Sequence, residues 1–258
     1  MAIFNIREAS IYPYYEQLIC FNKSARAKTE NAEFNAALNM NIILCSACLV
    51  EGVLEDRGKL LLGYYREVFN QIDVPDFELR KPMNHFYNSI EEMMHKKVSQ
   101  SMGLDNFATI FEMLTSKSLK QDEQIAIIYE GVSTLFQLRN VIAHGRLIHA
   151  YTVEAYYTNG SEENFFGGYK KAENYLTKKG LLSEGFMDVE RSDLYFTNDI
   201  ADHFSNIAHD FLRALDTYIS DALLIKEKIQ DRVKEFNEKR GTAYSIIEYL
   251  RQQGFKTY

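Results

Sequence analysis

The chain has 258 residues, 46% of them hydrophobic and 25% charged, which is the composition of an ordinary globular protein long enough to bury a core without disulfides or metals. Its formal net charge of −7 excludes a broad basic face of the kind that grips duplex nucleic acid, but it leaves room for a small local RNA site.

Helices are predicted for most of the first half of the chain. From about Ala32 to Asn70, apolar residues recur at spacings of three, four and seven, as on one face of a helix. After a connection that contains two prolines, further helices are expected over residues 88–102 and 106–116. The next helix begins near Gln121 and reaches His144, where the following glycine suits a left-handed C-cap.

The pattern changes after this helix. Residues 147–160 alternate with a period of two, are rich in β-branched and aromatic side chains, and end in Asn-Gly, which is a hairpin signal. Residues 164–169 could form the return strand, and a short helix over 170–179 is stopped by a glycine. We interpret residues 147–196 as an inserted α+β elaboration with a β-hairpin.

Helical periodicity returns from Asn198, which suits an N-cap, with two aspartates in the first turn at the positive end of the dipole. Residues 226–258 are predicted as a C-terminal helical extension, in which the polar residues after the stripe either continue the helix or follow a kink. One apolar stripe marks the helix that begins at Asn198, and it consists of Ile200, Phe204, Ile207, Phe211, Leu215, Tyr218 and Leu223. The sequence therefore predicts a mainly α fold, a helical bundle that forms a single domain over residues 1–258.

Cysteine usage and hydropathy both indicate the cytoplasm. The cysteines at positions 20, 45 and 48 make no spaced disulfide framework, as expected in a reducing compartment. The first ten residues carry charged side chains where a signal peptide needs its apolar stretch. The longest apolar run, residues 42–50, is about half of what spans a bilayer, so no membrane association is expected.

One segment combines residues that carry chemistry. In FQLRNVIAHGR, the fixed cation Arg139, the amide Asn140 and the imidazole His144 lie within two turns of one helix. Asn140 and His144 lie one above the other, so that Asn140 can orient His144 through a hydrogen bond. Arg139 is about 140° around the axis from His144. The two converge only if the arginine side chain swings round or a second copy of the helix supplies the complementary group.

These residue types suit cleavage of RNA by its own 2′-hydroxyl. A histidine near its reference pKa of about 6.5 can exchange a proton at neutral pH. An arginine can hold the scissile phosphate with two hydrogen bonds and stabilise its developing charge. No metal or other cofactor is needed for this chemistry. The structural alternative is that Arg139 pairs with a carboxylate and that His144 caps the helix.

The segment from Phe136 to Arg146 resembles the HEPN domain family, whose active members carry an Arg, four to six residues and a His, commonly with a polar residue after the Arg. The resemblance implies a HEPN-like antiparallel helical bundle and a metal-independent endoribonuclease with Arg139, Asn140 and His144 as catalytic residues. It also implies a homodimer in which two motifs meet in a composite active site. Family members include toxins of toxin–antitoxin pairs, antiviral effectors and RNA-processing nucleases, so an antitoxin or regulatory protein is a further expected partner.

Two positions refine the resemblance. Some HEPN toxins have a tyrosine two residues after the histidine, which a partner nucleotidyltransferase modifies, whereas this chain has Arg146 there. Regulation by that route is therefore not expected. In many members an acidic residue of an early helix approaches the motif, and Glu51 and Glu55, one turn apart, are the candidates.

Other signals are weaker. Cys45 and Cys48 have the spacing of a redox motif but lie in an apolar helical run, which favours buried side chains. A single Glu-x-x-His at residues 92–95 does not make a di-iron site, and His203 and His209 do not share a helix face. Besides the ribonuclease, two hypotheses stay open: a non-catalytic HEPN-like module that binds a nucleotide, RNA or a protein, and a purely structural helical protein.

Overall fold

The computed structural model describes residues 11–71, 84–86, 88–93, 103–143, 171–182 and 196–239, and for 65–71 and 223–239 it describes the helix without the side chains. Within these ranges the chain is mostly helical and contains no strand, so the prediction of a mainly α fold is confirmed. The predicted β-hairpin over residues 147–169 and the helix expected after residue 240 lie outside the described residues.

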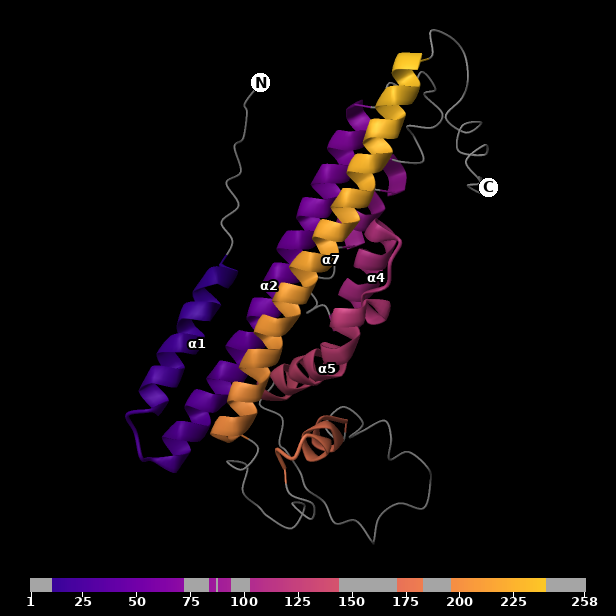
Figure 1. Ribbon diagram of the computed structural model, residues 1–258. Helices are drawn as coiled ribbons and strands as arrows, with labels where there is room; N and C mark the ends of the chain where they lie inside the picture. Colours follow the sequence, from indigo (N-terminus) through magenta and orange to yellow (C-terminus); the bar gives the residue numbers. More distant parts are fainter. Residues whose placement is uncertain are drawn as a thin grey trace, which may run out of the picture. The chain divides into compact units, whose positions relative to one another are not determined.

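Figure 1 shows the helices of the chain coloured in sequence order. Five α-helices and one 3₁₀ helix carry labels: α1 (Tyr12–Arg26), α2 (Ala32–Gln71), α4 (Leu104–Thr115), η1 (Leu119–Gln121), α5 (Glu123–Ala143) and α7 (Asn198–Lys239). Shorter helical segments cover residues 84–86, 88–93 and 171–178. The long helices match the predictions within a few residues, whereas α1 was not predicted.

The chain divides into two compact units, and the division cuts both long helices. Unit 1 comprises residues 1–57 and 102–215, and unit 2 comprises residues 58–101 and 216–258. In unit 2 the buried side chains are aliphatic and aromatic residues of α2, the 88–93 segment and α7: Leu61, Leu62, Ile90, Tyr218 and Ile219. The residues with candidate chemistry all belong to unit 1.

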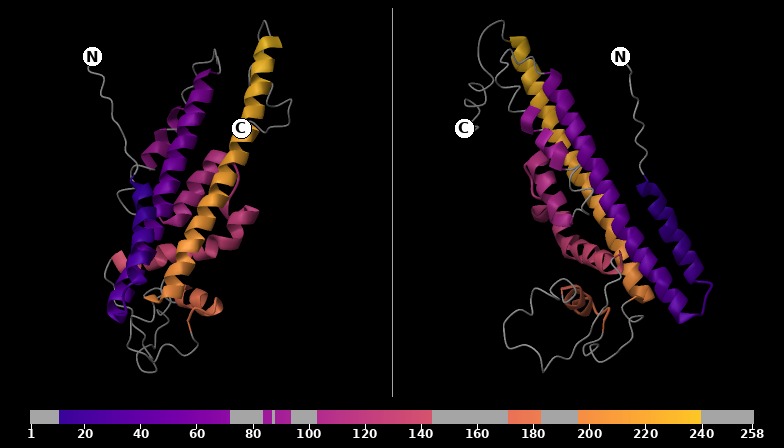
Figure 2. Two further views of the ribbon diagram at one scale, coloured as in Figure 1. Left: turned by 60° about the vertical axis from the view of Figure 1, so that its left-hand side comes forward. Right: turned by 180° about the vertical axis from the view of Figure 1, so that it is seen from behind.

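Helix α1 runs antiparallel to the first part of α2 (Figures 1 and 2). At its beginning, Tyr12 packs on Gly52, where an added Cβ would come within 2.6 Å of the tyrosine Cβ. At its end, the Arg26 guanidinium donates a hydrogen bond of 2.8 Å to Asn39 Oδ1. Because Gly52 lacks a side chain, the two helix backbones approach closely there.

Helix α7 begins beside the beginning of α2 and runs in the same direction (Figures 1 and 2). Asn39 of α2 donates from its Nδ2 to the Phe196 carbonyl at 2.7 Å and to Asn198 Oδ1 at 3.0 Å. Within unit 1 the first parts of α2 and α7 thus lie side by side and run in the same direction, and the HEPN-like antiparallel arrangement stays a prediction. Every described member of the predicted apolar stripe is buried, from Ile200 to Tyr218.

The N-cap of α7 is one residue earlier than predicted. Thr197 Oγ1 accepts a hydrogen bond of 3.3 Å from the Ile200 backbone N–H, and its carbonyl accepts one of 3.1 Å from Ala201. Asn198 was expected to cap the helix, but its side chain instead bonds Asn39. A hydroxyl and an amide compete for the same role at a helix start, and here the tertiary contact to α2 uses the amide.

The 171–178 helix packs against α5 and α7. It ends as predicted at Gly180, whose φ of +70° lies in the left-handed region that favours glycine. Tyr175 and Ile207 meet α5 at Gly131, where an added Cβ would lie 2.6 Å from the Tyr175 hydroxyl oxygen and 2.5 Å from Ile207 Cδ1. The glycine inside α5 therefore makes room for side chains of two other segments.

The turn between α4 and α5 is fixed by one aspartate. Asp122 Oδ1 accepts hydrogen bonds from the backbone N–H groups of Gln124 at 3.1 Å and Ile125 at 3.2 Å, which makes Asp122 the N-cap of α5. Its other carboxylate oxygen pairs with Lys117 Nζ at 2.6 Å. The helix was predicted to begin near Gln121 and begins two residues later.

The described residues include one helix, Ala32–Tyr64, that is long and apolar enough to cross a membrane by length and composition. Of its most apolar window, 61% is buried inside the protein. Core helices of soluble proteins share this length and composition.

Candidate functional site

The three predicted catalytic residues occupy the last turns of α5. Arg139 is buried at 8% exposure, and its side chain faces α2. Asn140 is exposed, as expected for a neighbour about 100° further round the helix. His144 follows the last residue of α5 and lies outside the described residues, as does Arg146. The structure thus places Arg139 and Asn140 on different faces and leaves the predicted Asn140–His144 hydrogen bond a prediction.

Arg139 is held by a carboxylate of α2. Its Nη1 donates a hydrogen bond of 2.7 Å to Glu51 Oε2, and the two side chains are only 9% and 23% exposed. The expectation that an acidic residue of an early helix approaches the motif is therefore confirmed for Glu51. The guanidinium also lies over the Phe136 ring, with 5.3 Å from Cζ to the ring centroid.

The pairing of Arg139 is incomplete. Its Nε is buried and has no hydrogen-bond partner in the described part of the chain. A buried donor left unpaired costs about 1–3 kcal/mol relative to a bonded one, so native proteins leave few of them. The Nε of Arg139 is thus a buried donor that the described residues leave unpaired.

Burial and Arg139 shift the pKa of Glu51 in opposite directions. Loss of hydration raises the pKa of the Glu51 carboxyl, the Arg139 charge and hydrogen bond lower it, and the nearby Glu55 charge raises it again. The net direction is upward. The carboxylate is thus less than fully stabilised by its arginine, because burial and a second carboxylate both oppose its charge.

The polar cluster continues from α2 to α1. Cys48, one turn before Glu51, is half-buried and shares a hydrogen bond with the Tyr15 side chain of α1. Burial raises the pKa of the Cys48 thiol, and the Glu51 charge raises it further, so the thiol stays protonated at neutral pH. Burial likewise raises the pKa of Cys45 to about 11. Neither cysteine has the lowered pKa of a reactive thiol.

The parts that Tyr15 and Cys48 play in this cluster were missed from the sequence. Tyr15 belongs to a helix that was not predicted, and no motif pointed to it. The spacing of Cys48 could have predicted its position. Residues 48, 51 and 55 are three and four apart, so they share one face of α2. The face that presents Glu51 to Arg139 therefore also presents Cys48.

Among the described residues, this cluster contains a buried fixed positive charge and no metal centre. Within the described ranges, no group of three or more His, Cys, Asp or Glu side chains gathers as metal ligands do. Arg139 supplies a fixed charge with an unused donor, and α5 ends one turn beyond it. A search for similar proteins among family models, curated proteins and solved structures found no match.

Proposed function

We propose that this protein is a metal-independent endoribonuclease of the HEPN type that cleaves RNA through the 2′-hydroxyl. His144 exchanges the proton, Arg139 holds the scissile phosphate and Asn140 orients the imidazole. The observation that carries the proposal is Arg139 itself, a buried cation with an unpaired Nε at the end of α5. A phosphate oxygen is the ligand that matches such a donor best.

Glu51 acts in this scheme as a positioning residue. It fixes the Arg139 guanidinium through one nitrogen, Nη1, while Nε has no partner among the described residues. Burial and the Glu55 charge oppose the charge of Glu51 and raise its pKa, so an incoming phosphate can compete with this carboxylate for the guanidinium. The same carboxylate keeps the buried charge compensated while no substrate is bound.

The compartment, assembly and biological role that we propose follow from the resemblance of the motif to the HEPN family. We propose a cytoplasmic homodimer that acts as a toxin or antiviral effector, with RNA as substrate and an antitoxin or regulatory protein as a further partner. The net charge of −7 fits a small site for single-stranded or looped RNA better than a long duplex track.

The test is cleavage of a mixed RNA pool in the presence of EDTA by the wild type, His144→Ala and the control His85→Ala. His85 is an exposed histidine of the 84–86 segment, so its loss should leave cleavage unchanged. The proposal predicts 2′,3′-cyclic phosphate or 3′-phosphate ends from the wild type and the control, and no cleavage by His144→Ala. Equal cleavage by all three would contradict it.

A second candidate is a HEPN-like module that binds a nucleotide, RNA or a protein without cleavage. The observation in its favour is that Arg139 is largely withdrawn from solvent and already paired with Glu51. A labelled oligonucleotide that binds the wild type, is released on Arg139→Ala, and is never cut would support this candidate over the first.

A further inference from the structure

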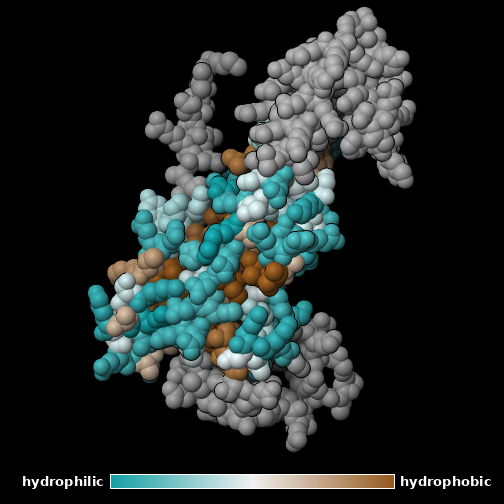
Figure 3. Space-filling model, in the orientation of Figure 1, coloured by the Kyte–Doolittle hydropathy of each residue, from teal (hydrophilic) through white to brown (hydrophobic). Residues whose placement is uncertain are grey.

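Helix α1 and its N-cap residue Ile11 carry a row of large apolar side chains that the fold leaves exposed. The exposed fractions are 64% for Ile11, 63% for Tyr14, 42% for Leu18 and 68% for Phe21. Figure 3 shows apolar side chains interrupting the hydrophilic surface along this helix. We call these four residues the α1 stripe. Single exposed apolar residues are ordinary, but four in one row form a patch.

The α1 stripe is not the face that α1 uses to join unit 1. The inward face carries Ile19 and Asn22, which are 2% and 3% exposed. At about 100° per residue, the centre of the stripe lies roughly 90° around the axis from these two residues. The stripe is therefore a second apolar face on one short helix, and burial within unit 1 does not account for it.

The spacing of the α1 stripe matches a seam between two helices. Its members follow each other at intervals of three, four and three, which is the a/d pattern of helices that pack side by side. The row is also symmetric about Glu16. Tyr14 and Leu18 lie two residues to either side of it, and Ile11 and Phe21 lie five residues to either side.

This symmetry selects an antiparallel copy of the same helix as the partner. With a two-fold axis at the level of Glu16, Tyr14 of each copy faces Leu18 of the other, and Ile11 faces Phe21. Each layer then pairs an aromatic ring with a branched aliphatic side chain. An isologous interface requires this reciprocity, in which residue i contacts j and j contacts i.

We propose that two copies of this chain associate through the α1 stripe, with the two α1 helices antiparallel. The four side chains expose roughly 450 Å² per copy, taking about 200 Å² for each full side chain. Two copies would thus bury roughly 900 Å² from the stripe alone, close to the 1,000 Å² or so that a specific interface needs. Residues beside the stripe would supply the remainder.

The charges of α1 argue against a lipid surface as the occupant. A helix that lies on a membrane has basic residues beside its apolar face. In α1 the two basic residues Lys23 and Arg26 are both paired with Asp202 of α7, at 3.2 Å and 2.8 Å. The stripe itself is bordered by the uncharged residues Gln17 and Ser24.

In this proposal the α1 stripe is the interface of the homodimer. That a dimer is required for activity rests on the proposed function. The same helix touches the candidate site, because Tyr15 bonds Cys48 and Tyr12 packs on Gly52, next to Glu51. Association can be measured by mass without RNA. A monomer and an inactive enzyme are therefore separate results.

The first experiment compares the mass of the wild type, Leu18→Glu and the matched control Cys20→Glu by light scattering after size exclusion. Both variants add one carboxylate to α1, but Cys20 is exposed on the side turned away from the stripe. The wild type and the control should have twice the chain mass of 30.0 kDa, and Leu18→Glu should run as a monomer. The dissociation constant should rise at least roughly 100-fold, because two carboxylates enter an apolar seam.

The second experiment fixes the direction of the helices by disulfide trapping in a Cys20→Ser background. Antiparallel pairing predicts that a mixture of Tyr14→Cys and Leu18→Cys chains cross-links under mild oxidation, whereas neither variant cross-links alone. Parallel pairing predicts the reverse, because each residue would meet its own copy. Far-UV circular dichroism of all variants checks that the helices are intact.

Three results would overturn the proposal. The first is a wild type that is monomeric at concentrations of about 100 μM, well above the range of stable dimers. The second is a dimer that Leu18→Glu leaves intact, or that Cys20→Glu dissociates equally. The third is a monomer that floats with vesicles of anionic lipid, which would assign the stripe to a membrane.

Discussion

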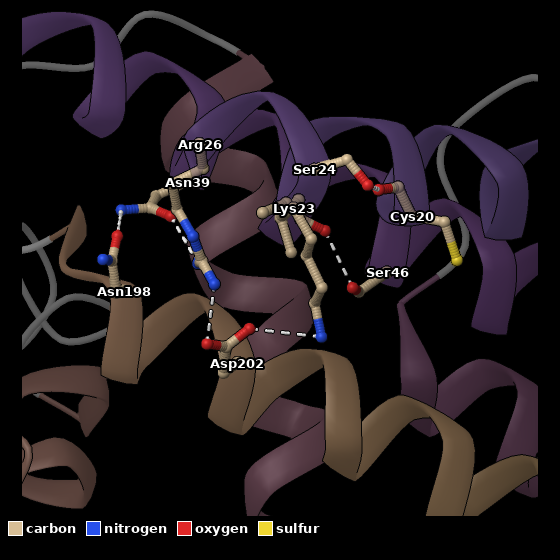
Figure 4. Close-up of polar contacts among 9 residues, drawn as sticks. Cys20, Lys23, Ser24, Arg26, Asn39, Ser46, Asn198 and Asp202 are labelled. Carbon is tan, nitrogen blue, oxygen red and sulfur yellow. Dashed lines mark hydrogen bonds and ion pairs between the residues drawn. The ribbon is translucent and has the colours of Figure 1, made fainter. Parts of the chain in front are cut away.

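Two arginines of unit 1 are almost equally buried but differ in how completely they are bonded. The Arg26 side chain is 12% exposed and donates to Asn39 Oδ1 and Asp202 Oδ2, both at 2.8 Å (Figure 4). The Arg139 side chain is 9% exposed, bonds Glu51 through Nη1 and leaves Nε unpaired. Burial alone therefore does not distinguish a fully bonded arginine from one with an unpaired donor.

The carboxylates of the two sites differ in the same sense. Asp202 accepts from Arg26 on one oxygen and from Lys23 on the other, and Asn39 ties the group to Asn198 at the start of α7 (Figure 4). Three helices meet in a closed network. Glu51 has a raised pKa because burial and the charge of Glu55 outweigh Arg139. The closed network joins three helices, whereas the Arg139–Glu51 pair leaves Nε unpaired and is where we propose that the substrate phosphate binds.

The largest expected effect comes from equal substitutions at the two arginines. Arg139→Lys should lower the rate of RNA cleavage at least about 100-fold, because an ammonium cannot replace a guanidinium that holds both Glu51 and a phosphate. Arg26→Lys should leave the rate per folded molecule within about twofold and instead lower the midpoint of urea unfolding. Similar losses of cleavage in both variants would contradict the distinction.

Removal of Glu51 should destabilise the protein more than removal of Asp202, although Asp202 pairs with two cations and Glu51 with one. Glu51→Ala leaves a 9% exposed arginine without compensation and should lower the free energy of unfolding by about 2–3 kcal/mol. Asp202→Ala releases two cations, but the aspartate is 38% exposed and water takes its place, so about 1 kcal/mol is expected. Urea titration measures both. A larger loss at Asp202 would mean that the Arg139 pair is open to solvent.

Both arginine sites depend on the docking of α1, which Gly52 permits. Gly52→Ala would push a Cβ to within 2.6 Å of Tyr12 Cβ, which cannot turn away, and should cost about 2 kcal/mol. Gly63 of the same helix has nothing within 4 Å of an added Cβ. Gly63→Ala should therefore raise stability by about 0.5–1 kcal/mol, since alanine favours the helix. Thermal unfolding of Gly52→Ala and Gly63→Ala separates the effect of the contact with Tyr12 from the effect of helix propensity.

The helices could be predicted from the sequence where one apolar face dominates. The stripe of α7 is buried as expected, since Ile200, Phe204 and Phe211 all have an exposure of 0%. Helix α1 was missed because its apolar residues fall on two faces, one inward and one exposed, and such a helix shows no single period. The cap at Thr197 was misassigned to Asn198 because the contact of Asn198 with α2 is tertiary.

The site residues stay a prediction from the sequence, and the contacts of Arg139 could not be predicted from it. The spacing of Arg139, Asn140 and His144 defined the motif, and Glu51 was one of two acidic candidates on α2. The burial of Arg139 and the unpaired Nε depend on how α5 crosses α2, which no local pattern encodes. The part played by Tyr15 depends likewise on the docking of α1.

The smallest expected effect is a pH dependence beside the closed network. His203 follows Asp202 on α7, and a hydrogen bond of 2.9 Å joins its Nε2 to the Tyr175 hydroxyl. Burial, with a contribution from the Lys179 charge, lowers the pKa of His203 from 6.5. Burial and the Glu130 charge raise the pKa of Tyr175 to about 12. The pair is therefore neutral at pH 7.

A histidine whose folded-state pKa is lowered contributes stability that is fully present above the unfolded pKa of 6.5 and is lost as the pH falls through the folded value. The wild type should thus lose stability below pH 6.5, by no more than the roughly 1 kcal/mol of one hydrogen bond. His203→Gln keeps a polar partner for Tyr175 and removes the titration, so its stability should be flatter from pH 6.5 to about 5. His209→Gln on the same helix is the control and should keep the wild-type slope. If His203→Gln keeps that slope too, the pH response belongs to other groups and not to the His203–Tyr175 pair.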